Sequence, residues 1–186
     1  ESATAKRLAN DFRAVGVALT TYQGVYRALP DDDPAAPGHT GGVLATTPVG
    51  TVGNFRIDGD WNSLNATDES YLIWQHLRLA RLLDGQTAVP GAPVVGDGYT
   101  PRNGVDGRLG LTSATILTAG SWPATHYICS SGIPGRQVRR LEHLSDDGNT
   151  LTGSLRTLCE GECSAGPGVS VTLANEAGNY TVCAAI

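Results

Sequence analysis

One segment of the sequence places oxygen-bearing residues at the spacing of a calcium-binding loop. Loop positions 1, 3, 5 and 12 carry side-chain oxygens and position 7 offers a backbone carbonyl: Asp58, Asp60, Asn62, Glu69 and Leu64. Ser63 stands at position six, where such a loop uses glycine for its sharp turn. Glu69 is equally explained as an acidic residue in the first turn of a helix. Calcium is therefore the one cofactor that the sequence suggests, and both interpretations stay open.

The other residues with potentially reactive side chains match no known catalytic motif. The four histidines lie far apart and beside no nucleophile motif, and the sequence contains no GxSxG, HExxH or P-loop pattern. Asp146-Asp147-Gly148-Asn149 is a second acidic segment, for which a simple β-turn is the preferred interpretation. We expect no catalytic site and no enzyme activity.

The four cysteines all lie in the last third of the chain, which predicts two disulfides and an oxidising compartment. Zinc is the rival interpretation, but the spacings do not match the usual paired ligands. Of three connectivities we favour Cys129–Cys183, since both residues lie in strand-like runs, and Cys159–Cys163, which closes a tight loop.

The elements that must position these residues begin with an amphipathic helix over residues 1–29. Its apolar residues are spaced 4, 3, 4, 3 and 4 apart, forming one stripe: Leu8, Phe12, Val15, Leu19, Tyr22 and Tyr26. Leu29-Pro30 and the acidic run Asp31-Asp32-Asp33-Pro34 end this helix.

Residues 30–107 read as a loop region rich in Gly and Pro, with short strands near Val43 and Phe55 and a second helix from Thr67 to Leu82. Residues 108–186 alternate like a sheet, in runs at 108–118, 125–130, 153–159, 169–174 and 180–184, with a short helix over 134–144. Strands that follow helices without βαβ alternation predict an α+β fold with an antiparallel sheet, in one domain of 186 residues.

Composition excludes several classes of partner. The net charge is -5 and the 13 basic residues are spread along the chain, so we expect no nucleic-acid partner. No run of eighteen apolar residues occurs, so the chain as given contains no predicted membrane span.

Several segments, in this order, resemble type IV pilins and the pseudopilins of type II secretion, the prepilin-type family. They are Tyr22-Gln23-Gly24-Val25-Tyr26-Arg27-Ala28-Leu29-Pro30, Asp31-Asp32-Asp33-Pro34, Thr67-Asp68-Glu69-Ser70 with Trp74-Gln75-His76-Leu77-Arg78, Tyr127-Ile128-Cys129 with Gly132-Ile133-Pro134-Gly135, and Asp146-Asp147-Gly148 with Thr152-Gly153-Ser154. The resemblance spans most of the chain. It implies a long N-terminal helix packed on an antiparallel sheet, in a pilin-like head.

The resemblance also implies a function, namely a structural subunit of a pilus or pseudopilus filament at the bacterial surface or in the periplasm. Its partners would be copies of itself and related pilins, bound through an apolar helix that this chain lacks, and the full-length precursor would lie in the inner membrane. The alternative is a minor tip or adhesin module that binds a surface, nucleic acid or secreted cargo. A major subunit coats the length of a filament, whereas a tip protein does not.

Overall fold

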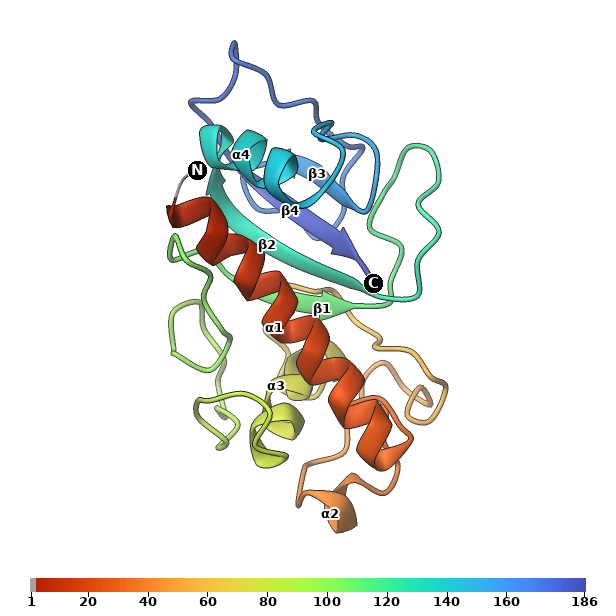
Figure 1. Cartoon of the computed structure of the whole chain (residues 1–186). Coiled ribbons are helices and arrows are strands. Elements are labelled where there is room, and N and C mark those ends of the chain that lie inside the picture. Colours follow the sequence, from red (N-terminus) through yellow and green to blue (C-terminus); the bar gives the residue numbers. More distant parts are fainter. Residues whose placement is uncertain (1–2) are drawn as a thin grey trace. The chain divides into compact units, whose positions relative to one another are not determined.

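The computed structural model describes residues 3–186, which fold into helices and strands of an α+β protein (Figure 1). In chain order the elements are α1 (Ala3–Tyr26), α2 (Ala36–His39), α3 (Glu69–Leu79), β1 (Leu109–Thr112), β2 (Tyr127–Pro134), α4 (Gly135–Ser145), β3 (Leu155–Glu160) and β4 (Asn179–Ala185). Two compact units share them: one of residues 3–13, 102–109 and 115–186, the other of residues 14–101 and 110–114.

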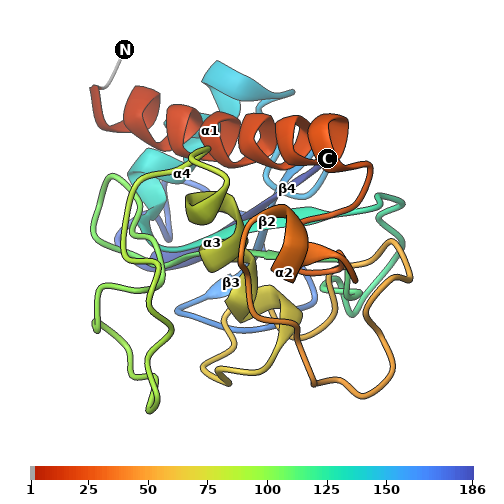
Figure 2. The same ribbon diagram turned by 90° about the horizontal axis from the view of Figure 1, so that it is seen from below.

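The antiparallel sheet has the strand order β1-β2-β4-β3; the strands β2, β4 and β3 belong to the first unit, whereas most of β1 falls in the second. β4 pairs with β2 on one side and with β3 on the other, although it comes last in the chain. α4 contacts β2, β3 and β4, and the two views show it lying on the same face of these strands as the first turns of α1 (Figures 1 and 2). That face of the sheet is therefore the core of this unit.

The residue pattern of α4 explains which of its sides faces the sheet. Val138, Leu141 and Glu142 follow the i, i+3, i+4 spacing of one helical face, and all three are buried. Arg136 and Arg140 point to the opposite side and are exposed. The inner face is thus apolar except for one carboxylate.

The second unit contains few regular elements, so α3 forms its centre. Tyr71, Ile73, Trp74 and Leu77 are each at most 1% exposed, and α3 is buried on nearly all sides. The ring of Tyr71 stacks on that of Tyr99 at 4.6 Å between centroids. The polar residues of α3 are buried too and bond to the surrounding loops: Gln75 Nε2 donates to the Thr87 carbonyl at 3.0 Å, and His76 Nε2 lies 2.8 Å from the Val43 carbonyl.

α1 is longer than any other element and contributes residues to both units. Five residues of the predicted stripe are buried, namely Leu8, Phe12, Val15, Leu19 and Tyr22. The sixth, Tyr26, is half-buried and stacks on His39 with 5.0 Å between ring centroids. Within residues 3–186, no helix combines the length and the apolar character that crossing a membrane would require.

Three of the predicted strands are absent from the described residues. Residues near Val43 and Phe55 are loops, and so is the run at 169–174. In that last run, the Val171 N–H donates to the Thr150 hydroxyl oxygen at 3.0 Å and the Thr172 N–H to Asn175 Oδ1 at 2.7 Å. Side-chain oxygens satisfy these amides, so the β-branched sequence needs no sheet partner.

Two disulfides join the cysteine pairs favoured from the sequence. Cys129 and Cys183 lie directly opposite each other on β2 and β4, with 4.0 Å between their Cα atoms. Cys159 and Cys163 close a short loop at the end of β3. Paired cysteines indicate an oxidising compartment, such as the periplasm or the extracellular space.

We predict that removing the two bridges has unequal effects. In the loop-entropy model, the bridge that spans 54 residues contributes about 4 kcal/mol to the free energy of unfolding and the one that spans 4 contributes about 2 kcal/mol. Urea unfolding of Cys129→Ala/Cys183→Ala and Cys159→Ala/Cys163→Ala proteins measures the difference. An equal or larger loss for the second pair would contradict the prediction.

Candidate functional site

Glu69 and the loop before it form an acidic region of the second unit. Glu69 is the first residue of α3 and is fully buried. Its Oε2 accepts a hydrogen bond from the Asp58 N–H at 2.7 Å, and its Oε1 accepts one from the Thr51 hydroxyl at 2.8 Å. Burial, followed by the charges of Asp32 and Asp58, raises the pKa of Glu69 to about 7 despite these two hydrogen bonds. Glu69 therefore anchors the loop to the start of the helix.

The other residues of the predicted calcium loop have separate contacts. Asp58 Oδ2 accepts a hydrogen bond from the side-chain amide of Asn54 at 2.8 Å, and the Asp60 carbonyl accepts one from Ser70 at 2.8 Å. In the described part of the chain, Asp58, Asp60 and Glu69 do not bring three carboxylate oxygens within 4.8 Å of one another. The calcium site at Asp58, Asp60, Asn62, Leu64 and Glu69 stays a prediction, whereas the contacts of Glu69 are those of a structural anchor.

The acidic run after α1 is buried. The carboxylate of Asp32 accepts hydrogen bonds from three consecutive backbone amides, those of Gly53, Asn54 and Phe55. Asp33 accepts one from the Tyr22 hydroxyl at 3.0 Å and lies 2.6 Å from His39 Nδ1. Asp32 and Asp33 thus tie the loop at 53–55 and helix α2 to the end of α1.

Asp31 and His76 form a buried pair that sequence reasoning missed. Both side chains are 0% exposed, and Asp31 Oδ1 lies 3.2 Å from His76 Nε2. His76 Nδ1 accepts a hydrogen bond from the Asp31 N–H at 2.9 Å, so Nε2 carries the ring proton and donates it to the Val43 carbonyl at 2.8 Å. Burial lowers the pKa of His76 and raises that of Asp31. The neutral His76 ring therefore holds the backbone of Asp31 and Val43 in place, and its complete burial keeps it from solvent.

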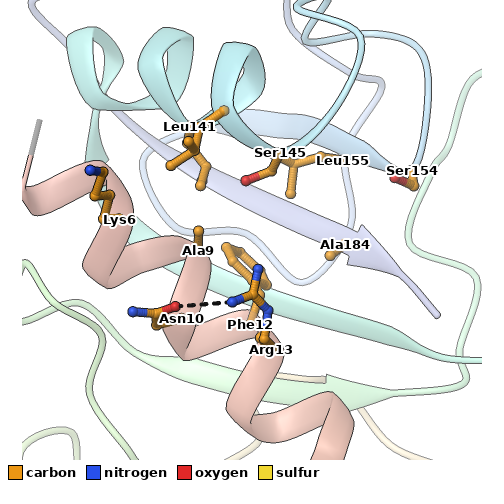
Figure 3. A pocket seen from close by; sticks show the side chains of 11 residues that line it. Lys6, Ala9, Asn10, Phe12, Arg13, Leu141, Ser145, Ser154, Leu155 and Ala184 are labelled. Carbon is orange, nitrogen blue, oxygen red and sulfur yellow. Dashed lines mark hydrogen bonds between the residues drawn. The ribbon is translucent and has the colours of Figure 1, made fainter. Parts of the chain in front are cut away.

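A groove in the first unit lies between the N-terminal part of α1 and α4, above the sheet (Figure 3). Its volume is about 500 Å³, its floor includes Phe12 and Leu155, and Lys6 and Arg13 stand along α1. Its other lining residues are small, polar or aliphatic, namely Ala9, Asn10, Leu141, Leu144, Ser145, Ser154 and Ala184.

The outer side of α1 in the second unit is exposed and carries small uncharged residues. Ala14, Val17, Thr21 and Gly24 lie there at spacings of 3, 4 and 3, and Val17 is 58% exposed. The Thr21 hydroxyl donates to the Val17 carbonyl at 2.7 Å, so its polar group is satisfied within the helix. This side of the helix presents almost no polar group that water must solvate.

We predict that Glu69→Gln stabilises the protein above neutral pH. The pKa of Glu69 is about 7 in the folded protein and about 4.3 in an unfolded chain, so the stability that its proton contributes is lost as pH rises from the lower value through the higher one. A glutamine amide donates to the Thr51 oxygen, whose hydrogen goes to the Pro48 carbonyl at 2.8 Å, while its Oε1 keeps the Asp58 bond.

Urea unfolding of wild type and Glu69→Gln at pH 5 and pH 8 measures this effect. The free energy of unfolding of the variant minus that of wild type should be about 1 to 3 kcal/mol larger at pH 8 than at pH 5. Glu69→Ala is the control, because it removes both hydrogen bonds and should be destabilised at each pH. A difference between wild type and Glu69→Gln that does not change with pH would refute the argument.

Comparison with known proteins gives no relative of this chain. No protein-family model, no curated protein and no solved structure matches it. The case for a function therefore rests on the residues and contacts described above.

Proposed function

We propose that this chain is the head of a type IV pilin-like subunit and that its role is structural, not enzymatic. The filament would lie at the bacterial surface or in the periplasm. The observation that carries the proposal is α1, a helix of 24 residues that buries one stripe and exposes the other side. At 1.5 Å per residue such a helix is about 36 Å long, enough to serve as a rod between subunits.

The exposed side of α1 is chemically suited to contact with a sister subunit. Ala14, Val17, Thr21 and Gly24 are short, and a Cβ added at Gly24 would meet no atom within 4 Å. Small side chains allow the ridges of a second helix to approach closely. Packing around an apolar helix N-terminal to α1, as the pilin resemblance implies, would bring further copies to this side.

The disulfides support a role outside the cytoplasm. Cys129–Cys183 ties two neighbouring strands of the sheet, and Cys159–Cys163 closes a loop beside them. A subunit that stays in a filament without chaperones benefits from bonds that constrain its unfolded state.

We predict that the 186-residue chain alone is a monomer. Its large exposed apolar residues, such as Val49, Phe55 and Leu173, are scattered along the sequence, and a net charge of -5 opposes association. Light scattering should give a molar mass close to 19.3 kDa. Stable fibres or defined oligomers formed by this chain would contradict the view that a helix N-terminal to α1 supplies the cohesion.

The filament proposal itself is tested by photo-crosslinking in a bacterium that builds prepilin-type filaments. The chain is joined behind the apolar half-helix of a host pilin, with a photoreactive amino acid in place of Val17. Crosslinked ladders of the subunit should form in sheared filaments. The matched control carries the photoreactive residue at Leu173, which is 73% exposed but lies in a loop far along the sequence, and should give few ladders.

Two outcomes would contradict the proposal. One is a folded, disulfide-bonded chimaera that never enters filaments. The other is a chimaera found at a few copies per filament and crosslinked to other subunits only, which would favour the tip or adhesin alternative.

A further inference from the structure

We propose that the groove between α1 and α4 binds an extended, acidic peptide segment of a partner protein, with acidic side chains against α1 and one apolar side chain on the floor (Figure 3). All of the residues that line the groove belong to the first unit. Its volume of about 500 Å³ falls within the range of about 300 to 1,000 Å³ that ligand-binding clefts have. The groove can therefore receive a few side chains of a partner, and the inference does not depend on the filament proposal.

The α1 wall of the groove is cationic at both ends and recessed between them. Lys6, Ala9, Asn10 and Arg13 line the groove and follow the i, i+3, i+4, i+7 spacing of one helical face. Lys6 and Arg13 are exposed, and the short side chain of Ala9 lies between them (Figure 3). Two positive charges along one wall attract a negatively charged partner.

The acids near the groove are held away from this wall. The carboxylate of Asp11 accepts a hydrogen bond from the Gly104 N–H at 2.7 Å. At the C-terminal end of α4, one carboxylate oxygen each of Glu142, Asp146 and Asp147 lies within 4.8 Å of the others. Burial, and then the charges of the two aspartates, raise the pKa of Glu142 to about 8, so it is largely uncharged at neutral pH. Charge complementarity therefore directs an acidic partner to the α1 wall and not to the loop after α4.

The floor and the edge of the groove suit an extended chain. Phe12 and Leu155 form an apolar floor on which one aliphatic side chain can be buried. The Ser145 and Ser154 hydroxyls are exposed at the groove and can bond to peptide groups. An extended segment has backbone N–H and C=O groups that need such partners, whereas a helix satisfies most of its own.

The spacing of the two cations specifies the sequence pattern of the peptide. Lys6 and Arg13 are seven residues apart, so their Cα atoms are separated by about 10.5 Å along the helix axis. In an extended chain, residues four apart are separated by about 13 Å and share one face with the residue midway between them. The long, flexible side chains of lysine and arginine can cover the difference. The matching pattern is acidic-x-apolar-x-acidic.

The test is an NMR titration of the 186-residue chain with the peptide Gly-Ser-Asp-Thr-Leu-Thr-Asp-Ser-Gly. The peptide should bind saturably, shift the amide signals of residues 6–13, 141–145 and 154–155, and bind more weakly as sodium chloride is added. Replacing both of its aspartates by lysine should weaken binding about tenfold or more, because attraction becomes repulsion. Replacing its leucine by serine should do the same, because the apolar anchor is lost.

Arg13→Glu separates specific recognition from general attraction. Arg13 is exposed and its Nη1 donates to Asn10 Oδ1 at 3.4 Å, so the variant should fold normally. It should bind the peptide about tenfold more weakly. Binding should be restored when one of the two aspartates of the peptide, but not the other, is replaced by lysine. Ala9→Leu fills the recess and should weaken binding of both peptides about tenfold without lowering the melting temperature.

The matched control is Arg140→Glu, which reverses an exposed charge on the outer side of α4. Its affinity for the peptide should equal that of wild type. The proposal is overturned if the peptide does not bind saturably at millimolar concentration, if the lysine peptide binds equally well, or if Arg140→Glu weakens binding as much as Arg13→Glu does. Preferential binding of phosphatidylglycerol vesicles that Arg13→Glu abolishes would also overturn it, because the groove would then recognise lipid.

Discussion

Backbone amides in long loops must find hydrogen-bond acceptors, and in this protein side-chain carboxyl and amide oxygens supply many of them. Asp32 accepts three consecutive amides, Glu69 accepts the amide of Asp58, and Asp146 accepts that of Leu155. Asn103 does the same with its Oδ1, which accepts the amides of Val105 and Gly107 at 2.9 and 2.8 Å. Buried amides without partners would cost more than a chain of this size can lose. These loops are therefore ordered by side-chain oxygens rather than by pairing between strands.

The same dependence on distant side-chain acceptors explains which parts of the fold could be predicted from the sequence. The stripe on α1 and the apolar face of α4 follow from 3.6-residue periodicity, which depends on local geometry alone. The cysteine pairs followed from strand-like runs and a short loop. In contrast, Asp31, Asp32 and Asp33 were interpreted only as a signal that ends a helix, because a sequence does not show which distant amides need an acceptor.

The two acidic segments, at 58–69 and at 146–149, also show what the sequence alone does not reveal about the partners of a carboxylate. The spacing from Asp58 to Glu69 matches a calcium loop, yet Glu69 serves a backbone amide and a hydroxyl. The segment at Asp146 reads as a turn because its third acid, Glu142, precedes it on α4. A signal was present, since Glu142 falls on the apolar face of the helix with Val138 and Leu141. Periodicity identifies that face, but only the fold shows that the carboxylate meets two others.

The position of β4 bears on how the protein is made. β4 is synthesised after β2 and β3, yet it lies between them in the sheet and carries the cysteine that bonds to β2. During synthesis, β2 can pair only with β1, and β3 has no partner strand, until β4 emerges. The Cys159–Cys163 loop can close earlier, because both residues precede β4. This sheet can therefore be completed only after β4 has been synthesised.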